Sequence, residues 1–202
     1  MKKPFLHRVI RRFCGERDGS VMVETVVCLP LLIWALVATY EFFEVHRYRS
    51  VREKATYTIA DMLSRETSSI NATYMDNTLR LFDGISGDDG INQIRVSVVQ
   101  HHKTDPADPN DAGYFSVWWS EVRGTGDLTI LQDADVQNAH AILPMMNHGE
   151  QVILVESISD YKPWFNVGLG SVVPIDTRLF TKIRFSGQLC WDTQHCGDNP
   201  GA

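Results

Sequence analysis

Several common signatures of function are missing from this 202-residue sequence. There is no phosphate-binding Gly-Lys-Ser/Thr loop, no His-Glu-x-x-His zinc motif and no Gly-x-Ser-x-Gly nucleophile turn. Gly168 and Gly170 lack the third glycine of a dinucleotide-binding loop. The sequence also lacks an internal repeat and a long disordered linker. These absences argue against the familiar nucleotide-binding and hydrolytic classes, and we expect a protein that is not an enzyme and carries no cofactor.

Positive charge is scarce beyond the first 18 residues. Residues 1–18 carry a net charge of +4 and the remainder carries −10. The acidic remainder argues against nucleic-acid binding. A basic head before an apolar run places the N-terminus in the cytoplasm, although Arg47, Arg49, Arg52 and Lys54 follow that run.

Cysteine is scarce as well. Cys14 precedes the apolar run and Cys28 lies within it, so Cys190 and Cys196 remain to pair in the soluble part. They would close a short loop, which suits a disulfide in the oxidising periplasm. The alternative is a metal site made of Cys190, His195 and Cys196, which would lack a fourth ligand.

Charge is almost absent from residues 21–40, where Glu24 is the one charged side chain. Twenty helical residues span about 30 Å, the thickness of the hydrocarbon core of a bilayer. The run therefore predicts a transmembrane helix. A secretory signal fits less well, because the run exceeds the usual apolar region and no small-x-small site follows it. Residues 25–28 also make a poor lipoprotein box, since no small residue precedes Cys28.

Glu24 is the anomaly in this run. A carboxylate in hydrocarbon costs several kcal/mol unless it is paired, neutralised or able to reach the headgroups from a helix end. If the chain were cut after Gly19, Ser20 would carry a new α-ammonium. That ammonium, on a neighbouring subunit staggered along the helix axis, could pair with the Glu24 carboxylate in low dielectric.

The N-terminal region resembles the class III signal of type IV pilins. It shares the basic leader, a cut site at Gly19, an acid at mature position five and an apolar helix. More closely, Gly-Ser-Val-Met-Val-Glu-Thr-Val-Val-Cys-Leu-Pro-Leu-Leu at residues 19–32, with Glu41-Phe42 beyond, resembles the TadE-like minor pseudopilins of the tight-adherence (Tad/Flp) pilus. The resemblance extends to residues 155–165, which contain a Val-Glu pair and a Tyr-x-Pro segment, and to residues 117–119. Where that family often ends in Pro-Arg, this chain has Lys-Ile-Arg at residues 182–184.

The resemblance implies a single-pass protein of the bacterial inner membrane, with a cytoplasmic N-terminus and a periplasmic C-terminal domain. It implies cleavage after Gly19 by a prepilin peptidase and pairing of the Ser20 ammonium with Glu24. Its implied partners are other pilins through the N-terminal helix, the Tad inner-membrane platform and the lipid bilayer. The implied role is the assembly or initiation of adhesive pili, in the pilus or at its base. Two alternatives are an uncleaved, single-pass envelope binding protein and, less favoured, an anchored hydrolase.

The first helix extends beyond the membrane run. Apolar residues recur every three or four positions among charged ones, at Tyr48, Val51, Ala55, Ile59, Met62 and Leu63. This amphipathic stripe predicts one helix over residues 21–65. Pro30 removes a hydrogen bond to the Val26 carbonyl and should kink or loosen the helix, either as a static kink or as a point of local melting.

The fold class expected for the whole chain is α+β, with a long N-terminal helix packed on a small antiparallel sheet domain, as in pilins. We divide the chain into a basic leader (1–19), a transmembrane helix with an amphipathic extension (20–66) and an extracytoplasmic α+β domain (67–202). A second helix is predicted over 73–82, ended by Gly84, Gly87 and Gly90. Strands are predicted over 91–99, 114–121, 151–159 and 178–189, with a hairpin-like loop over 101–113 and a short helix over 134–143.

Four further groups of side chains have alternative interpretations. His101 and His102 with Asp105, Asp108 and Asp111 could bind a cation, although the spacing fails the EF-hand pattern and Asp-Pro is ordinary turn chemistry. Glu156 could face solvent or pair with a buried arginine, and we favour a structural role. Of Trp118 and Trp119, one should be in the core and the other exposed or at an interface. Trp164 and Phe165 could form a binding surface.

Overall fold

The structure is a computed structural model that describes residues 18–87, 92–105, 107–108, 111–165 and 167–192. Its elements, in chain order, are α2 (Asp18–Ser64), α3 (Ala72–Ser86), β1 (Asn92–His102), β2 (Tyr114–Gly124), α4 (Asp133–Val136), β3 (Gln151–Tyr161) and β4 (Val173–Lys182). The four strands form one antiparallel sheet in the order β2-β1-β3-β4. The α+β layout and the hairpin between the first two strands are therefore confirmed.

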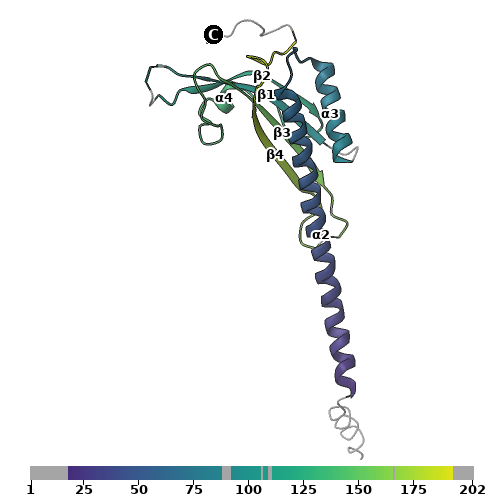
Figure 1. Cartoon of the computed structure of the whole chain (residues 1–202). Helices are drawn as coiled ribbons and strands as arrows, with labels where there is room; N and C mark the ends of the chain where they lie inside the picture. Colours follow the sequence, from purple (N-terminus) through teal and green to yellow (C-terminus); the bar gives the residue numbers. More distant parts are fainter. Residues whose placement is uncertain (1–17, 88–91, 106, 109–110, 166, 193–202) are drawn as a thin grey trace, which may run out of the picture.

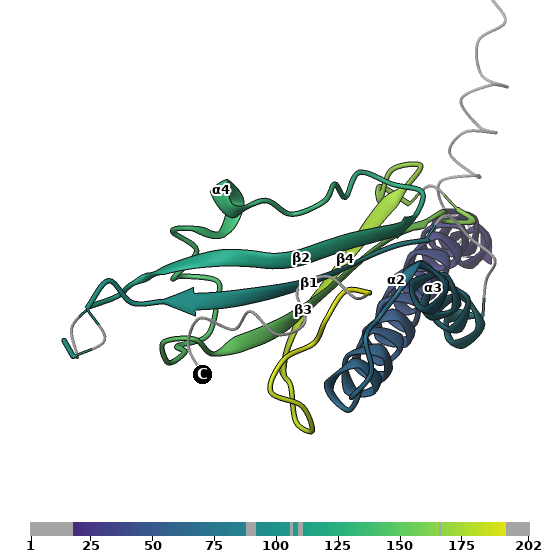
Figure 2. The same ribbon diagram turned by 90° about the horizontal axis from the view of Figure 1, so that it is seen from above.

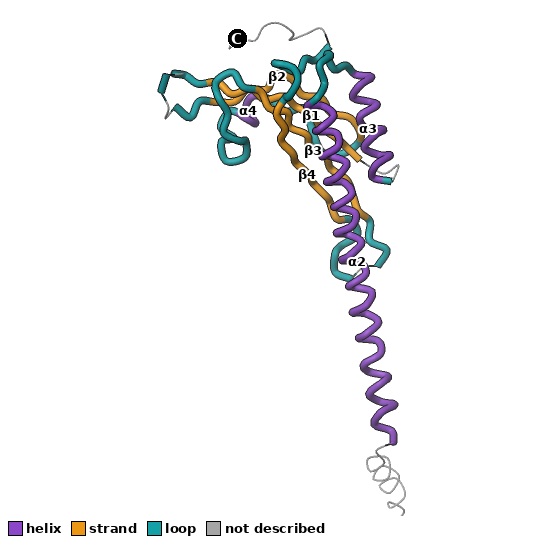
Figure 3. Tube along the Cα trace, in the orientation of Figure 1, coloured by secondary structure: helices purple, strands orange, loops and turns teal. Residues whose placement is uncertain are grey.

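Helix α2 is a single 47-residue helix, as the amphipathic extension predicted. Its C-terminal half packs on the sheet, whereas its N-terminal half projects away from the rest of the chain (Figure 1). Figure 3 shows this projecting half as an isolated helix with no strand or loop along most of its length.

Two layers of side chains cover the two faces of the sheet. Helices α2 and α3 lie on one face, and α4 with its flanking loops lies on the other (Figure 2). The core between the helices and the sheet contains Ala55, Ile59, Leu63, Met75, Phe82, Ile94, Val96, Val98, Trp119, Ile153 and Val155. A second cluster on the opposite face contains Val99, Phe115, Val136, Leu143 and Val152. Trp119 is buried and Trp118 is half-buried, but both pack on the same core cluster, so the prediction that one of them would be exposed was wrong.

Helix α3 is longer than predicted, and its boundaries have local causes. The Asn71 side chain accepts a hydrogen bond from the Tyr74 amide at 2.9 Å and caps the N-terminus. Gly87 ends the helix with φ of 73°, a left-handed conformation that suits glycine. Gly84 lies inside the helix, so the prediction that it helps to end this element was wrong.

The predicted fourth strand was shifted along the chain. It was expected over residues 178–189, but β4 covers Val173–Lys182 because it pairs with β3 along its whole length, from Tyr161–Val173 to Val152–Lys182. Pro174 lies in the first half of β4, and an edge strand tolerates proline. Beyond Lys182 the chain crosses to the helices, where the Arg184 amide donates to the Ser64 carbonyl at 2.9 Å.

The short helix before Pro144 was also predicted too long. Helix α4 has four residues, and the chain continues to Leu143 in turns. Val136 and Leu143 are both buried in the second core cluster, together with Phe115. Packing on the sheet, and not helix propensity, therefore determines the path of this segment.

Candidate functional site

The predicted processing residues lie in the first turn of α2. The helix begins at Asp18, so the peptide bond between Gly19 and Ser20 is at its N-terminal end. Glu24 follows one turn after Ser20, and four residues along a helix rise about 6 Å and return to nearly the same face. The backbone thus places the predicted new amine and the acid on one side of α2.

Glu24 is exposed on this helix. Among the described residues, no hydrogen bond or ion pair to its carboxylate is formed within the chain. Its apolar neighbours are exposed too: Leu32, for example, is 69% exposed. Within the described residues, no part of the most apolar window of α2 is buried, and the helix is long and apolar enough to cross a membrane.

The polar groups within the run are compatible with a membrane. Thr25 and Thr39 each donate their hydroxyl to the carbonyl four residues earlier, Val21 and Ala35, at 2.8 Å. Pro30 lies inside the helix, which continues through it without a break in the helical assignment. The hydrogen bond to the Val26 carbonyl is lost because proline has no amide hydrogen.

A buried acid marks the point where the bare part of α2 meets the sheet domain. Glu41 is 0% exposed. One of its carboxylate oxygens accepts the Tyr161 hydroxyl at 3.0 Å, and the other accepts the Phe165 amide at 2.9 Å. Burial and the Glu41 carboxylate raise the pKa of Tyr161 to about 12.

Aromatic contacts extend this junction up the helix. Tyr48 packs edge-on against Tyr161, with ring centroids 5.0 Å apart, and its hydroxyl donates to the Asp160 carbonyl at 3.1 Å. The guanidinium of the buried Arg52 lies over the Tyr48 ring. Sequence reasoning used Glu41 only as part of a family resemblance and missed this role. The available signal was an acid placed directly after the apolar run.

The structural interpretation of Glu156 is confirmed. Arg95, Glu156 and Arg178 stand opposite one another on β1, β3 and β4. The buried Glu156 accepts from Arg95 Nε at 2.6 Å and from Arg178 Nε at 2.7 Å. Arg95 also donates to the Thr129 carbonyl at 2.7 Å and so joins the sheet to the loop that covers it. This row of charges therefore links three strands of the sheet.

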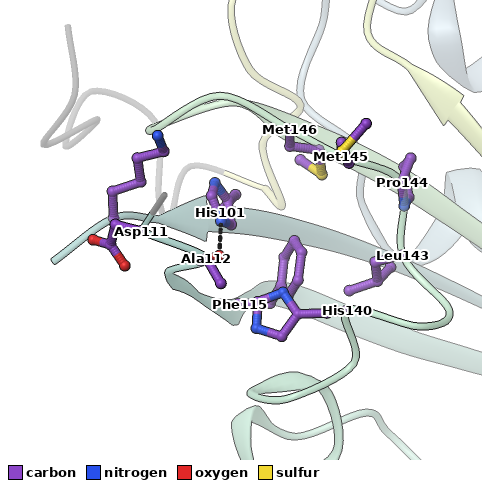
Figure 4. Close-up of a pocket in the computed structure, with 10 residues that line it drawn as sticks. His101, Asp111, Ala112, Phe115, His140, Leu143, Pro144, Met145 and Met146 are labelled. Carbon is purple, nitrogen blue, oxygen red and sulfur yellow. Dashed lines mark hydrogen bonds between the residues drawn. The ribbon is translucent and has the colours of Figure 1, made fainter. Parts of the chain in front are cut away.

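A pocket of about 310 Å³ lies at the end of the β1–β2 hairpin, lined by His101, Asp111, Phe115, His140 and Met146 among others (Figure 4). It is where the sequence suggested a cation site. His101 instead lies between two carbonyl groups, with Nε2 2.9 Å from the Ala112 oxygen and Nδ1 3.3 Å from the Asn147 oxygen.

The acidic residues of this hairpin make turns. Asp111 accepts the amides of Asp105 at 2.7 Å and Gly113 at 2.9 Å, and these backbone hydrogen bonds lower its pKa. No group of three or more possible metal ligands converges in the described part of the chain. The aspartates therefore act there as turn residues.

Cys190 takes part in a disulfide. Its predicted partner, Cys196, lies outside the described residues together with His195, so the Cys190–Cys196 pairing and the alternative metal site stay predictions. The Cys190 carbonyl accepts the Ile70 amide at 2.9 Å, and the Leu189 carbonyl accepts Trp119 Nε1 at 2.7 Å. This bonded segment is thus attached to the end of the helical layer.

Comparisons with protein-family models, with curated proteins and with solved structures found no match for this chain.

Proposed function

We propose that this chain is a minor pseudopilin, a structural subunit and not an enzyme, for the assembly or initiation of Tad-type pili. In this proposal a prepilin peptidase cuts the chain after Gly19. Helix α2 then packs with the helices of other pilins, and the subunit meets the Tad platform in the inner membrane. The N-terminus is cytoplasmic and the sheet domain periplasmic. The observation that carries the proposal is the bare apolar half of α2, with Glu24 near its start and no partner for Glu24 among the described residues.

Electrostatics explains why such an arrangement suits a subunit that assembles. An ionised carboxylate in hydrocarbon is costly, and the cost is offset when a cation comes within hydrogen-bonding distance in the same low dielectric. Cleavage after Gly19 would create that cation on Ser20. A neighbouring subunit displaced along the helix axis could then bring its amine to Glu24, and the pair would determine the stagger between subunits.

The position of the sheet domain supports the same proposal. The strands β3 and β4 pack on the C-terminal half of α2, and none of the most apolar window of this helix is buried within the described residues. This layout is compatible with a pilin-like subunit whose helix is surrounded first by lipid and later by other helices.

The mature N-terminus provides the decisive test. N-terminal sequencing of the protein from cells that contain the peptidase should begin at Ser20, and a Gly19→Leu variant should keep its leader, because the peptidase must approach the backbone closely at the cut. Assembled, functional material that still begins at Met1 would overturn the proposal.

A charge-removal variant tests the pairing itself. Glu24→Gln should be inserted in the membrane but fail to support pili, since the amine then loses its counter-ion. Glu44→Gln is the matched control, because Glu44 lies on the same helix and pairs with Arg47 outside the apolar run. Normal piliation in Glu24→Gln would show that assembly does not depend on pairing between Glu24 and the Ser20 ammonium.

The hairpin pocket favours a second candidate function. Its histidine, phenylalanine and methionine lining, at the end of the sheet far from α2, suits a small apolar ligand of an uncleaved envelope binding protein (Figures 1 and 4). An intact leader on the mature protein, together with saturable ligand binding that Phe115→Ala abolishes, would favour this alternative.

A further inference from the structure

The described residues of the loop between β3 and β4, 162–165 and 167–172, lie beside α2 below the end of the sheet (Figure 1). Phe165 and Val167 line a hollow of about 510 Å³ together with α2 residues between Leu29 and Val37. Every side chain in that lining is apolar. A loop of the sheet domain therefore reaches the level of the run that is long enough to cross a bilayer.

The junction at Glu41 holds the loop at this level. The Phe165 amide and the Tyr161 hydroxyl both donate to the buried Glu41 carboxylate, one from inside the loop and one from the strand before it. If the loop moved away, it would leave a buried carboxylate without one of its donors, which is costly. The loop is thus fixed to α2 just beyond the end of the apolar run.

The depth of the loop follows from helix geometry. If the hydrocarbon ends near Tyr40, then Val37 lies about 5 Å inside that boundary and Leu29 about 16 Å inside it, at 1.5 Å per residue. A side chain that contacts this stretch must lie in the same layer. Elements that lie in the membrane interface are typically inserted by about 5–10 Å, which matches the upper part of the hollow.

The exposed residues of the loop have the composition of a membrane interface. Trp164 is 85% exposed and Phe165 is 49% exposed, although both are large and apolar. Lys162, two residues before Trp164, is exposed as well. Tryptophan is enriched where acyl chains meet headgroups, and a lysine beside it can reach lipid phosphates.

We propose that the β3–β4 loop is a second membrane-binding element, in which Trp164 and Phe165 insert into the acyl–headgroup boundary beside α2 on the side of the sheet domain. The inference rests on α2 crossing the bilayer, and it holds whether or not the leader is removed. Insertion would fix the height and tilt of the sheet domain above the membrane, because the domain would then contact the bilayer at two points.

Quenching of tryptophan fluorescence tests the insertion. The full-length chain is reconstituted in phosphatidylcholine vesicles whose acyl chains are brominated near the headgroup, at a low ratio of protein to lipid. Trp164→Phe should reduce the quenched part of the emission, because Trp164 contributes to it. Trp191→Phe is the matched control and should leave the quenched part unchanged, since Trp191 packs on Trp119 in the sheet domain.

Three results would overturn the inference. Equal quenching in wild type and Trp164→Phe, with Trp164 open to aqueous iodide, would place the loop in water. Shielding of Trp164 that appears only at high protein density would assign the surface to a second copy of the chain. If Trp34→Phe also leaves the quenching unchanged, α2 itself does not span the bilayer. The inference then fails at its premise, the membrane crossing of α2.

Discussion

The two halves of α2 belong to one continuous helix but have opposite surroundings. In the C-terminal half, Ala55, Ile59 and Leu63 are wholly buried under the sheet. In the N-terminal half, residues that are as apolar or more so, such as Leu32 and Leu36, face outward on every side. The first half has one charge in twenty residues, whereas charged residues separate the apolar positions of the second.

The two halves of α2 differ in what must cover their apolar side chains. A single apolar stripe needs one partner surface, and the sheet domain provides it. A helix that is apolar all round needs an apolar medium on all sides, and this chain contains no element to supply one among its described residues. Glu156 on β3 and Glu24 on α2 differ in the same way. Glu156 has two arginine partners, whereas Glu24 has none within the described chain.

The largest effect on stability should come from Glu156, whereas Glu24 should have none. Glu156→Ala leaves Arg95 buried without its carboxylate and should reduce the free energy of unfolding of the sheet domain by about 3–5 kcal/mol. Glu24→Ala should leave it unchanged. Urea unfolding of the full-length protein in detergent, followed by tryptophan fluorescence, measures both. Equal losses of stability in the two variants would show that Glu24 is as important to the folded domain as Glu156.

A pair of leucines tests the packing side of the comparison. Leu63→Ala should create a cavity in the core and cost about 2–5 kcal/mol of unfolding free energy. Leu32→Ala removes the same atoms from the bare half and should cost the sheet domain nothing in the same assay. A loss of stability in Leu32→Ala would show that the first half contacts the domain after all.

The junction between the halves should give a smaller change. Tyr161→Phe removes the hydroxyl donor of Glu41 and should cost about 1.5–3 kcal/mol, the usual range for a hydrogen bond to a charged group. Tyr57→Phe is the control, because Tyr57 is exposed on the same helix. Thermal unfolding followed by near-UV circular dichroism would report the loss, and unchanged stability in Tyr161→Phe would exclude Glu41 as a structural clamp.

The smallest effect concerns pH and lies at the hairpin, far from α2. Burial, followed by the neighbouring His148 and His101, lowers the pKa of His102 below its usual 6.5. The unfolded chain therefore binds the proton more readily, so the contribution of neutral His102 is complete above pH 6.5 and is lost as the pH falls. Unfolding measured from pH 7.5 to 5.5 should show this slope, and His102→Gln should weaken it. His46→Gln, on the exposed side of α2, should keep the slope unchanged.

Local pattern was enough to predict much of the fold. The stripe at three- and four-residue steps predicted α2 to within a few residues, and strands were predicted over 91–99, 114–121 and 151–159, where β1, β2 and β3 lie. It was not enough for β4 and α4, because their limits depend on pairing with β3 and on packing against Phe115. The roles of Glu41 and Tyr161, 120 residues apart, were also beyond sequence reasoning, since neither residue has a local partner that would reveal the contact.

The sequence by itself determined that the first half of α2 needs an apolar medium and that the second half needs a surface to cover one stripe, because hydropathy and its period depend only on neighbouring residues. The tertiary structure decided which surface covers the stripe, where Glu156 finds its arginines, and how a loop more than 120 residues downstream comes to lie beside the apolar run. Those outcomes depend on strand pairing between distant segments, and the free energy of such pairing is not contained in any one window of the chain.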